Sequence, residues 1–291
     1  MKRVLFLASI VIMAASAAWG QAAKIQAPEL KTEKVFGDAF SPSTPPDDNI
    51  IGEYTGYSIE WPVSMGSVDL TALQNAVGLL ALPTEFSFGD DIHKVVERLI
   101  NNTSSLPVPQ ELNTAFFNAT DYSWMNNVDL PEFYYDLTLV QVIDKVDGAY
   151  VSYRNSRTAY AGATGWIYYY DLIFDLVNNK PLELNDILKK GTDEAIVKKI
   201  VKQLIKDHKV EDYKQLADSL GLMYNTYFEP VSNLPLPPLP QNINYCKGNF
   251  IFTYNPYEIA PGGVGKIIAV IPAKDLKKQM TDKAKRLLGI K

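Results

Sequence analysis

Asp171, Asp175 and Glu258 are the candidate acidic residues for hydrolytic chemistry in this chain. A glycan hydrolase uses two carboxyl groups, one of which holds a proton while the other stays ionised. Asp171 and Asp175 lie four residues apart in a segment with the pattern of a strand, which would separate them by roughly 13 Å. This distance exceeds the spacing that glycoside hydrolysis uses. A hydrolase of envelope glycan or peptide that uses Glu258 with Asp171 or Asp175 is therefore kept as an alternative, and no catalytic residue is assigned.

Other kinds of reactive site have little support in the sequence. His93 and Glu97 are four residues apart and would share one face of a helix, but a zinc site needs more ligands and no third one has a telling spacing. No serine, cysteine or lysine lies in a nucleophile motif. Cys246 is the single cysteine, so an intramolecular disulfide is impossible. We expect neither a metal nor a cofactor.

Two loops are better candidates, and they would serve for binding. Residues 160–165 (YAGATG) and 256–263 (PYEIAPGG) are rich in glycine, alanine and proline, and each carries an aromatic residue at its rim. Binding residues gather on loops that a rigid scaffold holds in place. The candidate binding residues are Tyr160, Gly162, Thr164, Tyr257, Glu258 and Pro261.

The first of these loops leads into an aromatic strand, which is predicted over residues 166–177. Side chains alternate between the two faces of a strand, and one face here carries no charge, so we expect it to pack in the core. Asp147-Gly148 supplies a tight turn between two preceding strands, and the three strands would form an antiparallel meander. The uncharged face of the aromatic strand consists of Trp166, Tyr168, Tyr170, Leu172, Phe174 and Leu176.

The remaining elements follow from hydrophobic periodicity and capping residues. Together they predict an α+β fold, in which an antiparallel sheet has helices packed on one face and two subdomains are associated. Residues 21–49 contain a proline-rich run without periodicity and are expected to be a flexible linker. Further strands are expected over residues 50–63, 249–254 and 266–271, and helices over residues 70–80, 92–100, 193–206, 213–220 and 276–287.

The N-terminus has the composition of a secretory signal peptide. Lys2 and Arg3 precede an apolar stretch that is shorter than the roughly 20 residues needed to span a bilayer, and small residues precede a cleavage site at Gln21. No cysteine follows closely enough for lipid attachment. We therefore expect residues 1–20 to be removed, a periplasmic or secreted protein without membrane insertion, an N-terminal subdomain over 50–150 and a C-terminal subdomain over 151–291.

The charge balance excludes some classes of partner. The chain has a formal net charge of −5, and loss of the two positive charges in the signal peptide changes it to −7. An acidic protein without a basic block is a poor match for nucleic acids or anionic membrane surfaces. With 47% hydrophobic residues, the chain can bury a large core without disulfides or metals.

The chain also resembles a known family, the RsiV-like domain of secreted envelope proteins. The resemblance rests on the 160–165 loop, the strand that ends at Phe174-Asp175, the segment 182–188 (LELNDIL) and the run 257–261 (YEIAP). Residues 57–82, a strand with a Trp-Pro pair and then a helix, are similar to the partner domain found upstream in that family. Thr164 stands where the family tends to have histidine, and Gly262 stands where it tends to have an aromatic residue.

The resemblance implies a function without catalysis. Its characterised members bind lysozyme or act near cell-wall glycan, so it implies a non-enzymatic binding module of the cell envelope. The expected partner is a lysozyme-like protein or peptidoglycan glycan.

Overall fold

The structure is a computed structural model that describes residues 27–47, 50–103, 108, 110–119, 133–161, 164–222 and 235–290. The expected signal peptide lies outside these residues. The strands are β1 (Lys31–Asp47), β2 (Ile50–Ser64), β3 (Phe133–Val146), β4 (Tyr150–Ala161), β5 (Thr164–Asp175), β6 (Lys180–Pro181), β7 (Asn242–Cys246), β8 (Asn249–Tyr254) and β9 (Ile267–Pro272). The helices are α2 (Thr71–Ala81), α3 (Ile92–Thr103), α4 (Gln110–Phe117), α5 (Leu184–Ile187), α6 (Asp193–His208), α7 (Tyr213–Leu220), the 3-10 turn η4 (Gly262–Val264), α8 (Ala273–Leu276) and α9 (Asp282–Leu287).

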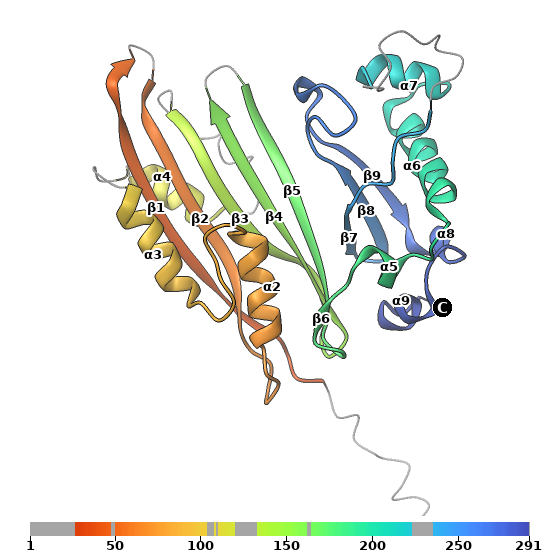
Figure 1. Cartoon of the computed structure of the whole chain (residues 1–291), viewed down its shortest axis with the longest axis horizontal. Coiled ribbons are helices and arrows are strands. Elements are labelled where there is room, and N and C mark those ends of the chain that lie inside the picture. The colour runs from red at the N-terminus through yellow and green to blue at the C-terminus, as the bar shows by residue number, and fades with distance from the viewer. Residues whose placement is uncertain are drawn as a thin grey trace, which may run out of the picture.

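The strands form two sheets, as Figure 1 shows. The larger sheet has the order β1-β2-β3-β4-β5-β6 and is antiparallel except between β2 and β3. The smaller sheet has the order β7-β8-β9 and is antiparallel. The predicted α+β class and the β3-β4-β5 meander are therefore confirmed. The boundary between two subdomains that was expected at residue 150 lies at the turn between β3 and β4. These two strands pair within one sheet.

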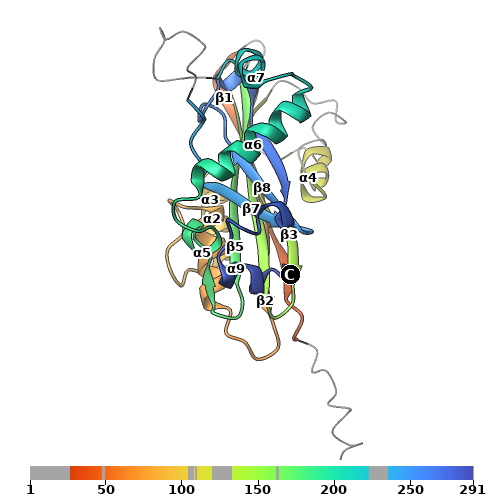
Figure 2. The same cartoon turned by 90° about the vertical axis from the view of Figure 1, so that its right-hand side faces the viewer.

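The elements stack in layers. Helices α2 and α3 cover one face of the large sheet, where their apolar residues pack with Val151, Tyr153 and Phe174. Helix α4 and the small sheet cover the other face, and α6 packs on the outside of the small sheet (Figure 2). Helices therefore lie on both faces of the large sheet. Among the described residues, no helix has both the length and the apolar composition needed to cross a bilayer.

Strand β1 corrects the expectation of a flexible linker over residues 21–49. Residues 31–47 pair antiparallel with β2, and Val35 and Ala39 are buried under α3 and the neighbouring strands. Gly37 allows α3 to approach closely, since a Cβ there would lie 2.7 Å from the Val96 side chain. The prolines at the end of this segment obscured the strand pattern that precedes them.

Candidate functional site

Tyr257, in the second of the two predicted loops, lies beside the strand that follows the first. Its ring centroid lies 5.7 Å from that of Trp166, the residue that directly follows the 160–165 loop. The backbone of Tyr257 is in the left-handed region, with φ of 68°, and its ring packs on Gly262, where a Cβ would come within 2.2 Å of the ring. The side chain remains 53% exposed. The loop 256–263 and the start of β5 are thus adjacent.

The other predicted binding residues are placed less completely. Tyr160 pairs with Gly165 at the end of the β4-β5 hairpin, and Thr164 is the first residue of β5. The side chains of Tyr160 and Thr164, and the whole of Gly162, lie outside the described residues. Pro261 is exposed and precedes η4.

Glu258 stabilises its own loop. Its Oε2 accepts a hydrogen bond from the Asn255 N–H at 2.5 Å. Partial burial raises the pKa of the Glu258 carboxyl, while the hydrogen bond from Asn255 lowers it. The side chain therefore holds the turn that presents Tyr257.

Three aromatic side chains continue the row along β5. Trp166, Tyr168 and Tyr170 lie on the face that α2 covers further along the strand, where Leu172 and Phe174 pack in the core. Trp166 and Tyr168 are half-buried, and Tyr170 is 45% exposed. The alternation along β5 predicted that this whole face packs in the core, and the structure corrects that expectation because α2 covers one half of it. We call Trp166, Tyr168, Tyr170 and Tyr257 the aromatic face.

Polar groups lie directly beside the aromatic face. Arg157 on β4 is the cross-strand partner of Tyr168, and its Nη2 lies 3.4 Å from Asp136 Oδ2. Burial raises the pKa of Tyr57 to about 12, and the nearby carboxylates of Asp136 and Glu85 add to this rise. Aromatic rings flanked by a guanidinium, carboxylates and a hydroxyl can stack on a ligand and also exchange hydrogen bonds with it.

A pocket of about 270 Å³ opens where α2 ends beside the aromatic face. Its apolar wall comes from the end of α2 and the residues after it, and its polar wall comes from β4. The strand β5 contributes one exposed ring. We call it the α2 pocket, and it is lined by Leu79, Leu80, Pro83, Asn155, Arg157 and Tyr170.

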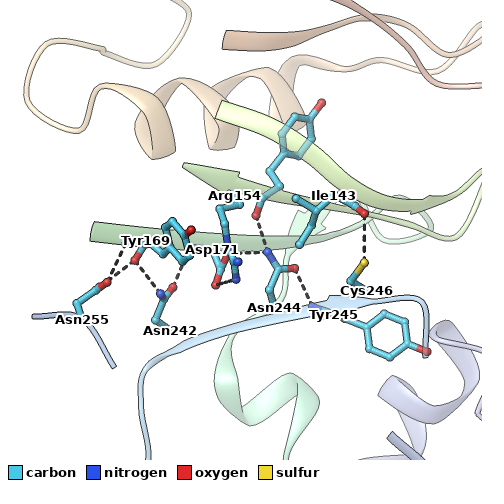
Figure 3. A network of polar contacts seen from close by, with 10 residues as sticks. Ile143, Arg154, Tyr169, Asp171, Asn242, Asn244, Tyr245, Cys246 and Asn255 are labelled. Carbon is cyan, nitrogen blue, oxygen red and sulfur yellow. Dashed lines mark hydrogen bonds and ion pairs between the residues drawn. The ribbon is translucent and has the colours of Figure 1, made fainter. Parts of the chain in front are cut away.

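A buried polar network on the opposite face joins the two sheets (Figure 3). Arg154 donates two hydrogen bonds to Asp171, at 2.7 and 2.9 Å. Asn244 on β7 donates a third to Asp171 at 2.6 Å. The side chain of Asp171 is completely buried, and that of Arg154 is 16% exposed. These contacts satisfy the buried charges and dock β7 against β4 and β5.

Two asparagines pair with the free edge of β5 in the same region. The Tyr169 N–H donates to Asn255 Oδ1 at 2.8 Å, and the Asp171 N–H donates to Asn242 Oδ1 at 2.8 Å. Both amide groups donate in return to the Tyr169 carbonyl. The asparagine side chains thus replace a neighbouring strand over this part of the edge, and Figure 3 shows both.

The acidic residues of the alternative hydrolase do not form a pair. The Asp175 carboxylate is buried, accepts hydrogen bonds from the Val177 and Asn178 N–H groups and lies 3.4 Å from Lys283 Nζ. It is therefore bound to the turn at the far end of β5 from the Asn255 and Glu258 loop. Each of the three carboxylates is used in a local structural contact.

The part of the chain that the structure describes holds no cluster of metal ligands, and its cysteine is hydrogen-bonded. There, no group of three or more His, Cys, Asp or Glu residues converges to hold a metal ion. His93 lies 2.9 Å from Glu33 on β1. The Cys246 thiol donates to the Ile143 carbonyl, and burial raises its pKa.

A larger groove of about 660 Å³ lies between α6 and the end of β9. Lys199, Lys202 and Lys206 form its polar wall, with Ile271 and Pro272 opposite. No aromatic ring lines this groove among the described residues, and its lysines are the exposed face of an amphipathic helix. The aromatic face with the α2 pocket is therefore the better candidate site.

Comparison with known proteins supports the fold. Residues 185–274 match the profile of a family described as a protein of unknown function, DUF3298. A crystal structure of a member of that family from Bacteroides fragilis is 19% identical, with a TM-score of 0.66, over 90% of this chain and 97% of that one. One from Pseudomonas aeruginosa is 16% identical, with a TM-score of 0.55, over 88% and 96%. No curated protein matches. At these identities the likeness concerns the fold alone.

Proposed function

We propose that this protein is a non-enzymatic binding module of the cell envelope, and that its aromatic face binds the glycan of the cell wall. The observation that carries this proposal is the row of rings from Tyr170 to Tyr257, which stays accessible on a folded sheet. A pyranose ring has an apolar C–H face that stacks on such rings, and hydroxyl groups at its edge. The polar groups of Arg157, Asp136 and Tyr57 match those hydroxyls with both donors and acceptors.

The conformation of Tyr257 supports the same proposal. A non-glycine residue in the left-handed region costs of the order of 1–3 kcal/mol, and such strain clusters at binding sites. The strain here holds a ring that is half exposed to solvent, so it does not serve core packing. Presentation of the ring to a ligand accounts for it.

The setting of this function comes from the sequence. The predicted signal peptide would deliver the protein to the periplasm or the exterior, where peptidoglycan is accessible. The resemblance to RsiV-like domains names a lysozyme-like protein as a partner of a different class. The exposed rings beside an accessible pocket favour the glycan, and lysozyme is the second arm of the test.

Co-sedimentation with purified, insoluble peptidoglycan tests the proposal. We expect the wild-type protein to be retained, and Tyr170→Ala and Tyr257→Ala each to weaken binding about tenfold, which is about 1.4 kcal/mol. Phe117→Ala is the matched control, because Phe117 is 44% exposed and packs with Phe36 on the opposite face of the sheet. Its binding should equal that of the wild type.

The lysozyme arm uses immobilised lysozyme with the same four proteins. If lysozyme retains the protein and peptidoglycan does not, the partner is a protein and not the glycan. Absence of retention by peptidoglycan, or equal losses in Phe117→Ala and Tyr170→Ala, would contradict the proposed function.

A further inference from the structure

One residue that lines the α2 pocket, Asn155, carries a buried hydrogen-bond acceptor. Asn155 is 1% exposed, and its Oδ1 has no hydrogen-bond partner among the residues that the structure describes. Its Nδ2 donates to the Leu80 carbonyl at 2.7 Å. This bond fixes the orientation of the amide, because a flipped amide would place its oxygen against that carbonyl. An unpaired buried acceptor is unfavourable, and a ligand N–H that reached it would remove the penalty.

The other residues of the pocket add two further requirements. Leu79, Leu80 and Pro83 form an apolar wall at the end of α2. Within the described ranges, Arg157 makes one ion pair, the 3.4 Å contact with Asp136, so its guanidinium retains N–H donors for a ligand oxygen. A small group that fits this pocket therefore carries an N–H donor, a carbonyl-type acceptor and a methyl-sized apolar end.

We infer that the α2 pocket holds the acetamido group of an N-acetylhexosamine whose pyranose ring stacks on Tyr170. The acetamido N–H would donate to Asn155 Oδ1 and its carbonyl would accept from Arg157. Its methyl group would lie against Leu79, Leu80 and Pro83. This inference rests on the proposed function and names the sugar that the aromatic face selects.

The size of the pocket agrees with one N-acetylhexosamine unit. Its 270 Å³ is close to the lower end of small-molecule pockets, about 300 Å³. It therefore accommodates one substituted sugar ring, while the aromatic face carries the neighbouring sugars. A plain hydroxyl would leave the apolar wall without a contact, and a free amine would place a positive charge beside Arg157.

Three soluble oligosaccharides of equal length separate the alternatives. They are β-1,4-linked N-acetylglucosamine, its de-N-acetylated form and the corresponding glucose oligomer. We expect isothermal titration calorimetry to give the wild-type protein at least about tenfold tighter binding of the acetylated form. An acetylated dipeptide amide, which has the same N–H and carbonyl without a sugar, should bind at least about tenfold more weakly than the acetylated oligosaccharide.

Two variants connect the preference to the pocket. Asn155→Leu removes the acceptor, and Leu79→Phe fills the pocket from a half-buried position without removing a polar group. In each variant, the ratio of affinities between acetylated and de-N-acetylated forms should fall to about one. Far-ultraviolet circular dichroism and the urea midpoint of each variant should show a cooperatively folded protein, so that a loss of the preference is not a loss of the fold.

The outcomes distinguish the inference from the proposed function. Equal binding of all three oligosaccharides by the wild type would overturn the inference and leave glycan binding in place. A preference that persists in both variants would place the acetamido site elsewhere and overturn it too. If the protein binds none of the sugars and peptidoglycan does not retain it, the proposed function itself is overturned. If the protein binds the dipeptide most tightly, the ligand of the pocket is a peptide and not a sugar.

Discussion

At the scale of single residues, Gly262 decides where the Tyr257 ring lies. The ring packs directly over the backbone of Gly262, and any side chain there would meet it. Gly262 thus leaves this space to the Tyr257 ring, which contacts Trp166.

Substitution of this glycine provides the first prediction. Gly262→Ala should displace the Tyr257 ring from Trp166 and weaken peptidoglycan binding about tenfold, while the fold is retained. Gly263→Ala is its control, because a Cβ at Gly263 meets nothing within 4 Å. Co-sedimentation and near-ultraviolet circular dichroism measure the two effects. Unchanged binding in Gly262→Ala would show that the position of Tyr257 is irrelevant to the ligand.

The second residue-scale prediction concerns the two Arg–Asp pairs. Asp171→Asn leaves Arg154 buried without its carboxylate and should lower the free energy of unfolding by about 3–5 kcal/mol. Asp136→Asn removes the partner of Arg157, which is an exposed pair, and should cost about 0–1 kcal/mol. Urea denaturation compares the two variants. If the two variants lose similar amounts of unfolding free energy, Arg154 and Asp171 do not form a buried charge pair.

At the scale of elements, the free edge of β5 is closed by side chains. Asn255→Ala should release the Tyr169 amide to hydrogen exchange, because its acceptor is lost, while the Asp171 amide stays protected. Asn242→Ala should have the reverse effect. Each variant is the control for the other in an NMR or mass-spectrometric exchange measurement. Protection of both amides in both variants would show that another group covers this edge.

The sequence predicted β5 well, but it predicted the environment of β5 only in part. Alternation along the strand correctly separated the Tyr168 face from the Asp171 face. Whether a face is buried depends on the helix above it, and nothing in residues 166–177 states that α2 ends halfway along. For the same reason, the α2 pocket could not be predicted: it combines α2 with β4, whose residues lie about 75 positions later.

The sequence was enough to select the second loop, residues 256–263. It was not enough to predict the contact of this loop with Trp166. Glycine, proline and an aromatic residue mark residues 256–263 as an ordered loop. Its position beside β5 depends on Asn255 and Asn242, which lie at the end of one short strand and the start of another. Asparagine is common in loops and turns, so neither residue carried a recognisable signal for edge pairing.

At the scale of the whole molecule, buried tyrosines make the fold sensitive to alkali. Burial raises the pKa of Tyr57 to about 12, and it raises the pKa values of Tyr54, Tyr150, Tyr153 and Tyr254 above the ordinary value. Tyrosines in the unfolded chain ionise near pH 10. Their contribution to stability is therefore fully present below about pH 10 and is lost as the pH rises through the folded-state values.

We expect the urea concentration at the unfolding midpoint to decrease as the pH is raised from about 9 to about 11. Tyr57→Phe should show a shallower fall, because one group with a raised pKa has been removed. Chemical denaturation followed by far-ultraviolet circular dichroism measures both slopes. A midpoint that does not change over this range would contradict the burial of these hydroxyl groups.

The binding of glycan on the aromatic face is tested most directly by hydroxyl-radical footprinting with mass spectrometry, with and without soluble peptidoglycan fragments. Oxidation of Trp166, Tyr168, Tyr170 and Tyr257 should fall when the glycan is bound. Oxidation of Phe117, on the other face of the sheet, should stay the same. Protection of Phe117 in place of the four rings, or oxidation that is unchanged at all five positions when the fragments are bound, would contradict a glycan site on this face.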